Sequence, residues 1–254
     1  MSGHSKWSQI RRQKGVNDSR RGQLFTKLGR EIQVASRAGG PDPDANFRLR
    51  LAVQKARESN MPLDNIQRAI ARGAGAGEGG NFDEITYEGY GPGGVAILVE
   101  AMTDNRNRTV AEVRNIFSRN GGNMGETGSV AWMFDPRGAI TIDADGHDPE
   151  EIELAAIDAG ASDVTVDGGD VTIITESALL DEVRRALADH FKIVDAENTV
   201  VPQTTVEPDP KQAPQILKLI ERLEELDDVQ RVHSNVDFSD EMLQEYEGAV
   251  GSRQ

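Results

Sequence analysis

The sequence contains no cysteine among its 254 residues, and aromatic residues make up only 5% of it. Disulfide bonds, thiolate catalysis and cysteine-based zinc sites are therefore excluded, and a reducing compartment is expected. Long apolar runs are also missing, because the longest, Val95–Val99, is far shorter than the roughly 20 residues that cross a bilayer. The N-terminus is polar and basic without an apolar signal region. Together these absences predict a soluble cytoplasmic protein with no membrane partner.

Residues that commonly carry catalysis or bind metal ions are also scarce. The four histidines are scattered, and neither an HExxH zinc pattern nor a GxSxG nucleophile motif occurs. The acidic cluster at 143–148 has its glycine two positions too early for an EF-hand loop, so a turn before a helix explains it better. The sequence therefore predicts a protein that is not an enzyme and has no catalytic residues, metal site or cofactor.

Charge is plentiful but unevenly distributed. Residues 1–73 hold 15 Lys and Arg against six Asp and Glu, a net charge of +9, whereas the whole chain carries −15 and residues 74–254 therefore carry −24. The bulk isoelectric point of about 4.7 hides this division. A cationic module on an anionic body predicts a nucleic-acid contact at the N-terminal end only.

The basic segment has the pattern of a short arm followed by helices. Asp18 can cap a first helix that ends before Gly39, a second helix is predicted from Asp42 to about residue 59, and a third over Leu63–Arg72. Five glycines in residues 73–80 then predict a flexible linker. Residues 1–80 are thus expected to form a basic three-helix domain with an arm and a glycine-rich linker.

Beyond the linker, the apolar pattern changes to that of alternating strands and helices. A capping-box pattern at Thr109–Glu112 predicts the start of a helix, and strands are predicted at 95–102 and 129–134. Residues 139–201 follow the β-α-β-β-α-β order of ferredoxin-like domains, and the flanking segments repeat that order split in two. The predicted fold class is α+β, with the three-helix domain followed by two ferredoxin-like βαββαβ domains, one inserted in the other. The predicted domains are 81–135 with 204–240, the insertion 136–203, and a flexible acidic tail at 241–254.

The residues expected to contact nucleic acid lie in the arm and the first helix. Lys and Arg side chains neutralise phosphates, and Trp7 can stack on an exposed base. A basic surface that serves only solubility is the weaker interpretation, because the excess of +9 is concentrated on one module of an acidic protein. The predicted contacts are Lys6, Trp7, Arg11, Arg12, Lys14, Arg20, Arg21, Lys27 and Arg30.

A second anion site is predicted at Arg106 and Arg108, which lie beside the N-terminus of a helix in acidic surroundings. A solvated loop explains the same residues equally well, and so does a contact with another domain. The nearby turn Gly89–Gly94 matches GxGxxG, but a strand follows where a dinucleotide site requires a helix. The alternative function is an enzyme or binding protein for a small phosphorylated ligand at Gly89–Gly94 and Arg106.

Longer motifs extend along almost the whole chain, to about residue 240. They include Gly3–Trp7 (GHSKW), Tyr87–Gly94 (YEGYGPGG), Thr103–Val110 (TDNRNRTV) and Asp227–Gln230 (DDVQ). In this order they resemble the YebC/PmpR family, to which the mitochondrial translational activator of cytochrome oxidase also belongs. The resemblance implies a helical N-terminal domain and two α/β domains. It also implies either a transcriptional regulator that binds DNA, or a translation factor that binds ribosomal RNA and eases stalling at proline-rich sequences.

The choice between DNA and RNA depends on how the module would contact its ligand. Duplex DNA favours a helix in the major groove, whereas folded RNA favours insertion of the arm and stacking on its bases. None of the predicted short helices has the pattern of a recognition helix, so the sequence slightly favours RNA, including the ribosome as a partner. The oligomeric state stays open between a monomer and a weak dimer.

Overall fold

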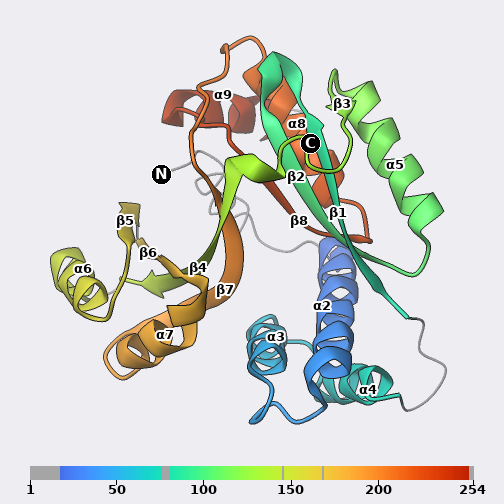
Figure 1. The fold of residues 1–254 in the computed structure, drawn as a ribbon. Coiled ribbons are helices and arrows are strands. Elements are labelled where there is room, and N and C mark those ends of the chain that lie inside the picture. The colour runs from blue at the N-terminus through green and yellow to red at the C-terminus, as the bar shows by residue number, and fades with distance from the viewer. Residues whose placement is uncertain (1–17, 76–80, 145, 168, 252–254) are drawn as a thin grey trace. The chain divides into compact units, whose positions relative to one another are not determined.

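The structure is a computed structural model that describes residues 18–75, 81–144, 146–167 and 169–251. The chain divides into two compact units, of which one is 134–203 and the other is formed by the described residues on either side of it. N-terminal helices precede two four-stranded antiparallel sheets with helices, which confirms the predicted α+β class (Figure 1). No helix in the described ranges is both long and apolar enough to cross a membrane.

The N-terminal helices are α2 (Asp18–Gly39), α3 (Phe47–Glu58) and α4 (Leu63–Gly73), in agreement with the prediction except at the start of α3. That helix begins later because Asn46 caps it, accepting a hydrogen bond from the backbone N–H of Leu49 at 3.1 Å. Fully buried side chains such as Ile32, Leu49 and Ile66 join the helices in one apolar core.

The sheet of this unit is built on a hairpin. Strands β1 (Asp83–Tyr90) and β2 (Ala96–Thr103) pair over their full length, and the short turn Pro92–Gly94 joins them. Strand β3 (Asn123–Met124) adds to β1, and β8 (Val229–Ser234) adds to β2, which gives the order β3-β1-β2-β8.

This order corrects the predicted split βαββαβ arrangement. The segment 129–134 is not a strand of this sheet, because Ala131–Met133 forms a 3-10 turn and Phe134 begins a strand of the other unit. The physical reason is that the backbone amides of Val130 and Ala131 donate to the carboxylate of Glu88, as does that of Gly128 just before the segment, so they are not available to a neighbouring strand. Residues 204–207 contribute only an isolated bridge between Val206 and Val236.

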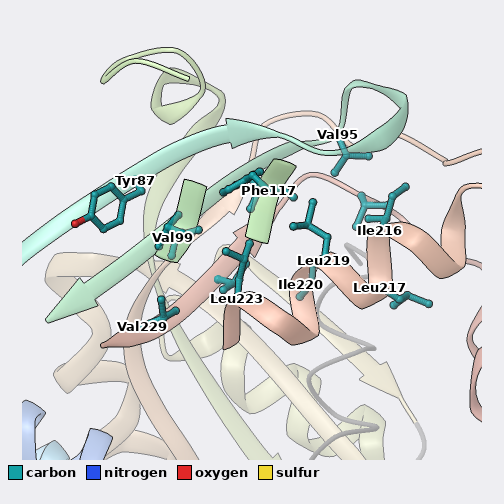
Figure 2. Packing of buried hydrophobic residues seen from close by; sticks show 14 of the residues in the cluster. Tyr87, Val95, Val99, Phe117, Ile216, Leu217, Leu219, Ile220, Leu223 and Val229 are labelled. Atoms are coloured by element: carbon teal, nitrogen blue, oxygen red, sulfur yellow. The ribbon is translucent and has the colours of Figure 1, made fainter. Parts of the chain in front are cut away.

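Helices α5 (Arg106–Arg119), α8 (Ala213–Glu224) and α9 (Asp240–Gly251) complete this unit. Figure 2 shows Val99 of β2 packed with Phe117 of α5 and with Ile220 and Leu223 of α8, all in one buried cluster. Within the tail predicted at 241–254, the described residues up to 251 belong to helix α9. Leu243 of α9 is buried in the same cluster, so apolar contact stabilises the helix.

The start of α5 also differs from the prediction. The helix begins one turn before the capping-box pattern, because the side chain of Asn105 accepts a hydrogen bond from the backbone N–H of Arg108 at 3.1 Å and caps it there. Thr109 is therefore inside the helix, where it is fully buried.

The unit 134–203 has the ferredoxin-like order predicted for the insertion. Its sheet order β5-β6-β4-β7 places the first strand between the last and the third. Isoleucines from β4 and β6, such as Ile140 and Ile173, are fully buried together with Leu187 of α7. The elements are β4 (Phe134–Asp143), α6 (Pro149–Asp158), β5 (Asp163–Asp167), β6 (Asp170–Glu176), α7 (Leu180–Ala188) and β7 (Lys192–Pro202).

Candidate nucleic-acid interface

Only part of the predicted interface lies in the described chain. Arg21 is exposed on α2, with its guanidinium carbon 5.6 Å from the centre of the Phe25 ring. Lys27 and Arg30, further along the same helix, are half-buried. Outside the described residues lie Lys6, Trp7, Arg11, Arg12 and Lys14, and also the side chain of Arg20.

The basic side chains of α2 contact the C-terminal end of α8. The Lys27 ammonium donates to the carbonyl of Glu224 at 2.6 Å, and the guanidinium of Arg30 donates to the carbonyl of Asp227 in the following turn. Carbonyls at the end of a helix lack partners within it and lie at the negative end of its dipole. Lys27 and Arg30 therefore hold α2 to the sheet-bearing part of their own unit, and a contact with nucleic acid stays a prediction for them.

Asp228, next along the turn, is the centre of this contact and is only 3% exposed. One carboxylate oxygen accepts hydrogen bonds from Thr109 at 2.6 Å, Arg108 at 2.7 Å and Thr103 at 3.0 Å. The other oxygen lies 2.9 Å from the Arg30 guanidinium. Burial raises the pKa of Asp228, but these hydrogen bonds and the charge of Arg30 together lower it below its usual range. Asp228 is therefore a buried anion that connects α2, β2 and α5.

The predicted second anion site already has carboxylates of the protein beside it. Arg108 donates to Asp104 at 2.9 Å as well as to Asp228, and Arg106 donates to Asp83 at 2.8 Å. The hydrogen bond and charge of Arg106 lower the pKa of Asp83. These ion pairs account for both arginines as structural contacts, and binding of an external anion there stays a prediction.

A shared phosphate site at Gly89–Gly94 and Arg106 has no support in the geometry. Tyr90 pairs with Ala96 at one end of the hairpin, whereas Asp83, the partner of Arg106, pairs with Thr103 at the other. The eight residues of β2 between them span roughly 25 Å. The turn also leads into a strand and not into a helix. Among the described residues, no group of three or more His, Asp and Glu is placed to hold a metal ion.

Helix α5 carries two further basic residues that no motif in the sequence indicated. Arg114 and Arg119 are exposed, and neither has an ion-pair partner within the described chain. Their signal in the sequence is local composition, because residues 106–119 contain four arginines and one acidic residue in an otherwise acidic body. The N-terminal helices likewise expose Arg57, Arg68 and Arg72.

The loop after β3 is fixed by a single buried carboxylate. Glu88 of β1 is 3% exposed, and it accepts hydrogen bonds from the backbone amides of Gly128 at 2.6 Å, Val130 at 2.7 Å and Ala131 at 2.8 Å. Burial raises the pKa of Glu88, but the three amides outweigh it and lower the pKa overall. The Glu88 carboxylate therefore ties three backbone amides of this loop to β1.

Replacing Glu88 with glutamine is expected to lower the free energy of unfolding by about 2 kcal/mol, because charged hydrogen bonds are lost and a buried amide group lacks acceptors. Urea denaturation followed by circular dichroism measures the change. Glu126→Gln is the matched control, since Glu126 is exposed in the same loop and should change stability by less than about 0.5 kcal/mol. Equal effects of the two substitutions would contradict the assigned role.

Comparison with known proteins extends over both units. The TACO1/YebC protein N-terminal domain model matches residues 5–76, and the model of the TACO1/YebC second and third domain matches residues 82–236. A probable transcriptional regulatory protein of Chloroflexus aurantiacus (strain J-10-fl) is 57% identical over 251 residues, which cover 97% of this chain and 100% of that protein.

Other relatives show the same extent of similarity. A probable transcriptional regulatory protein of Herpetosiphon aurantiacus is 55% identical, with 97% of this chain and 98% of that protein covered. The crystal structure of a conserved hypothetical protein from Aquifex aeolicus matches with a TM-score of 0.85 and 47% identity, over 89% of this chain and 94% of that one. The similarity therefore includes the N-terminal helices, both sheets and the turn at Asp228.

Proposed function

Since the chain belongs to the TACO1/YebC family, we propose that it is a non-enzymatic regulator of gene expression that binds nucleic acid in the cytoplasm. The names of relatives 51–57% identical to it, probable transcriptional regulatory proteins, support the regulatory role. The observation that carries nucleic-acid binding is the charge division, with +9 in residues 1–73 of a chain whose total is −15. Such an excess attracts phosphates at one end of the protein.

The contacts of α2 bear on which basic residues of the N-terminal segment can bind nucleic acid. Lys27 and Arg30 hold the helix to the end of α8 and the turn at Asp228, while Arg57, Arg68 and Arg72 of the neighbouring helices stay exposed, where phosphates can reach them. The acidic surface elsewhere in the chain repels nucleic acid. In this proposal the arm and the exposed arginines of the N-terminal helices make the contact, and α2 holds them in place.

We infer that ribosomal RNA is the favoured ligand and duplex DNA the second candidate. Helices α3 and α4 are 12 and 11 residues long, and α2 is held through Lys27 and Arg30 to the C-terminal end of α8 and the turn after it. None of the three has the side-chain pattern of a recognition helix, which favours RNA over duplex DNA. Duplex DNA stays the second candidate because the relatives are named probable transcriptional regulatory proteins, and DNA is the template of transcription.

Binding across a salt series tests both ligands. The full-length protein is titrated into a fluorescently labelled DNA duplex and into a hairpin of ribosomal RNA, from about 50 to about 200 mM KCl, with anisotropy as the readout. The logarithm of the association constant should fall linearly with the logarithm of salt concentration, and RNA should bind more tightly than DNA. Salt-independent binding, or no binding to either, would contradict the proposal. Tighter binding to DNA than to RNA would make duplex DNA the favoured ligand in place of ribosomal RNA.

A further inference from the structure

Helix α6 of the unit 134–203 is apolar on the side that faces away from its own core. Its inner side carries Ile152 and Ala156, which are fully buried where the helix contacts β5 and β6 (Figure 1). Leu154 and Ile157 are 65% and 54% exposed, and they lie about 150° around the helix from the buried pair. Residues three apart share one helix face. A helix that is apolar on two sides therefore has one side that its own unit leaves uncovered.

The residues around the exposed pair are acidic. Helix α6 contains no Lys or Arg. Its four carboxylates are all exposed, and none of them forms an ion pair with another described residue. They are Glu150, Glu151, Glu153 and Asp158. The outer face of α6 is therefore a short apolar stripe bordered by negative charge that the described chain does not neutralise.

The charge of the whole unit limits what can cover this stripe. Residues 134–203 contain 17 Asp and Glu against four Lys and Arg, a net charge of −13. Such a charge repels nucleic acid, anionic lipid surfaces and a second copy of the same unit. It attracts a basic protein segment. Charge complementarity therefore favours a protein partner rich in Lys and Arg.

The spacing of the apolar pair defines the partner further. In paired helices, apolar side chains pack along a central stripe and opposite charges meet on both sides of it. Lys and Arg also cover apolar surface with their aliphatic stems while their charged heads reach carboxylates. Helix α6 has 10 residues and is about 15 Å long. A basic amphipathic helix of about three turns matches its length, its apolar stripe and its charge.

We propose that the outer face of α6, with Leu154 and Ile157 at its centre, binds a basic amphipathic helix of a partner protein. The apolar stripe supplies the packing contact, and the four carboxylates of α6 pair with Lys and Arg of the partner. So small an interface suits a transient contact. This surface is distinct from the N-terminal nucleic-acid interface, and the inference does not depend on the proposed function.

A designed peptide tests the surface directly. The probe is a synthetic helix of about 14 residues, with leucine along one face and lysine on both sides of it. One control peptide replaces every lysine by glutamate, and a second replaces every leucine by serine. Each is titrated into the full-length protein by isothermal titration calorimetry. We expect saturable binding of the leucine–lysine peptide with one site per chain, and no saturable binding of either control peptide.

Substitution of the apolar pair tests whether the peptide binds at α6. Leu154→Ala combined with Ile157→Ala should weaken peptide binding roughly tenfold, because the central packing contact is lost. Alanine is the strongest helix former, so the circular dichroism spectrum should not change. Leu63→Ala is the matched control, since Leu63 is 55% exposed at the start of α4, and it should retain the affinity.

Substitution of the carboxylates tests the charge contact. Glu150→Gln combined with Glu153→Gln should weaken peptide binding roughly threefold and reduce its dependence on salt. Glu182→Gln combined with Asp189→Asn removes the same charge at exposed positions in and just after α7 of the same unit. This control variant should bind the peptide almost as well as wild type.

Other occupants of α6 give different results, each of which would overturn the proposal. Equal losses in the α6 variants and their controls would show general attraction between charges. Tighter peptide binding after Arg11, Arg12 and Lys14 are changed to alanine would show that the arm of the chain itself covers α6. A dimer in analytical ultracentrifugation that Leu154→Ala with Ile157→Ala dissociates would identify a second copy as the occupant. Absence of saturable peptide binding would also overturn the proposal, and none of these results bears on nucleic-acid binding.

Discussion

Replacing Asp228 with asparagine is expected to lower the free energy of unfolding by about 3 kcal/mol, because it removes the charge of a buried carboxylate and leaves Arg30 without its ionic partner. Arg30 has only 15% of its side chain exposed, so water replaces the lost charge poorly. Arg108 is 43% exposed and should contribute less of the loss. Thermal or urea unfolding of the purified variant measures the effect.

Asp227→Asn is the matched control, since the adjacent residue is exposed and contacts Arg30 only through its backbone carbonyl. It removes the same charge and should change stability by less than about 0.5 kcal/mol. Similar losses for both variants would show that net charge, and not the buried contact, is responsible.

The same substitution has a defined pH dependence. The folded protein lowers the pKa of Asp228 from its usual 3.8, so the carboxylate stabilises the fold fully above that value and progressively less as pH falls through the lowered pKa. The difference in stability between wild type and Asp228→Asn should therefore be constant near neutral pH and shrink below about pH 4. A difference that persists unchanged at low pH would contradict the ionic contact.

Removing four charges from the arm and the start of α2, with Arg11, Arg12, Lys14 and Arg20 all changed to alanine, should weaken nucleic-acid binding roughly a thousandfold at about 50 mM salt. Each lost phosphate contact lowers the slope of log K against log salt by about 0.7 to 0.9, so the slope should fall by roughly 3. Anisotropy titrations of wild type and variant across the salt series give both quantities.

Lys27→Ala combined with Arg30→Ala provides a control on the same helix. These two side chains contact the carbonyls of Glu224 and Asp227 and the carboxylate of Asp228. Their removal should therefore reduce stability and change the salt slope little. A slope that is unchanged in the four-residue variant, or that falls equally per charge in this control, would refute the assignment of the interface.

Several features of the protein could be predicted from neighbouring residues alone. The apolar spacing and the glycines that follow predict α2 and α4 within a residue or two of their observed ends. The ferredoxin-like order of the inserted unit is likewise encoded in successive short patterns. The division of charge needs no structure at all, because it is a property of the sequence. Local propensity, periodicity and composition depend on residues close in the chain.

The incorrect predictions have one cause in common, which is contact between residues that are far apart in the chain. The segment 129–134 has the composition of a strand, but its amides bond to Glu88, some 40 residues earlier. The pattern at Thr109–Glu112 resembles a capping box, but Asn105 caps the helix and the Thr109 hydroxyl donates to Asp228, 119 residues later. The acidic tail was predicted to be flexible, but Leu243 enters a core assembled from other elements, and α9 forms there.

The sequence by itself therefore determined the class of fold, the helical N-terminal segment and the end of the chain at which positive charge gathers. Only the tertiary structure decided which charged side chains form ion pairs, because it brings Arg30 of α2 to Asp228 after α8. It also decided that Trp132 is exposed, because the loop that carries this residue bonds to Glu88. The reason is that ion pairing and burial depend on distances between residues far apart in the chain, which a pattern of neighbours does not contain.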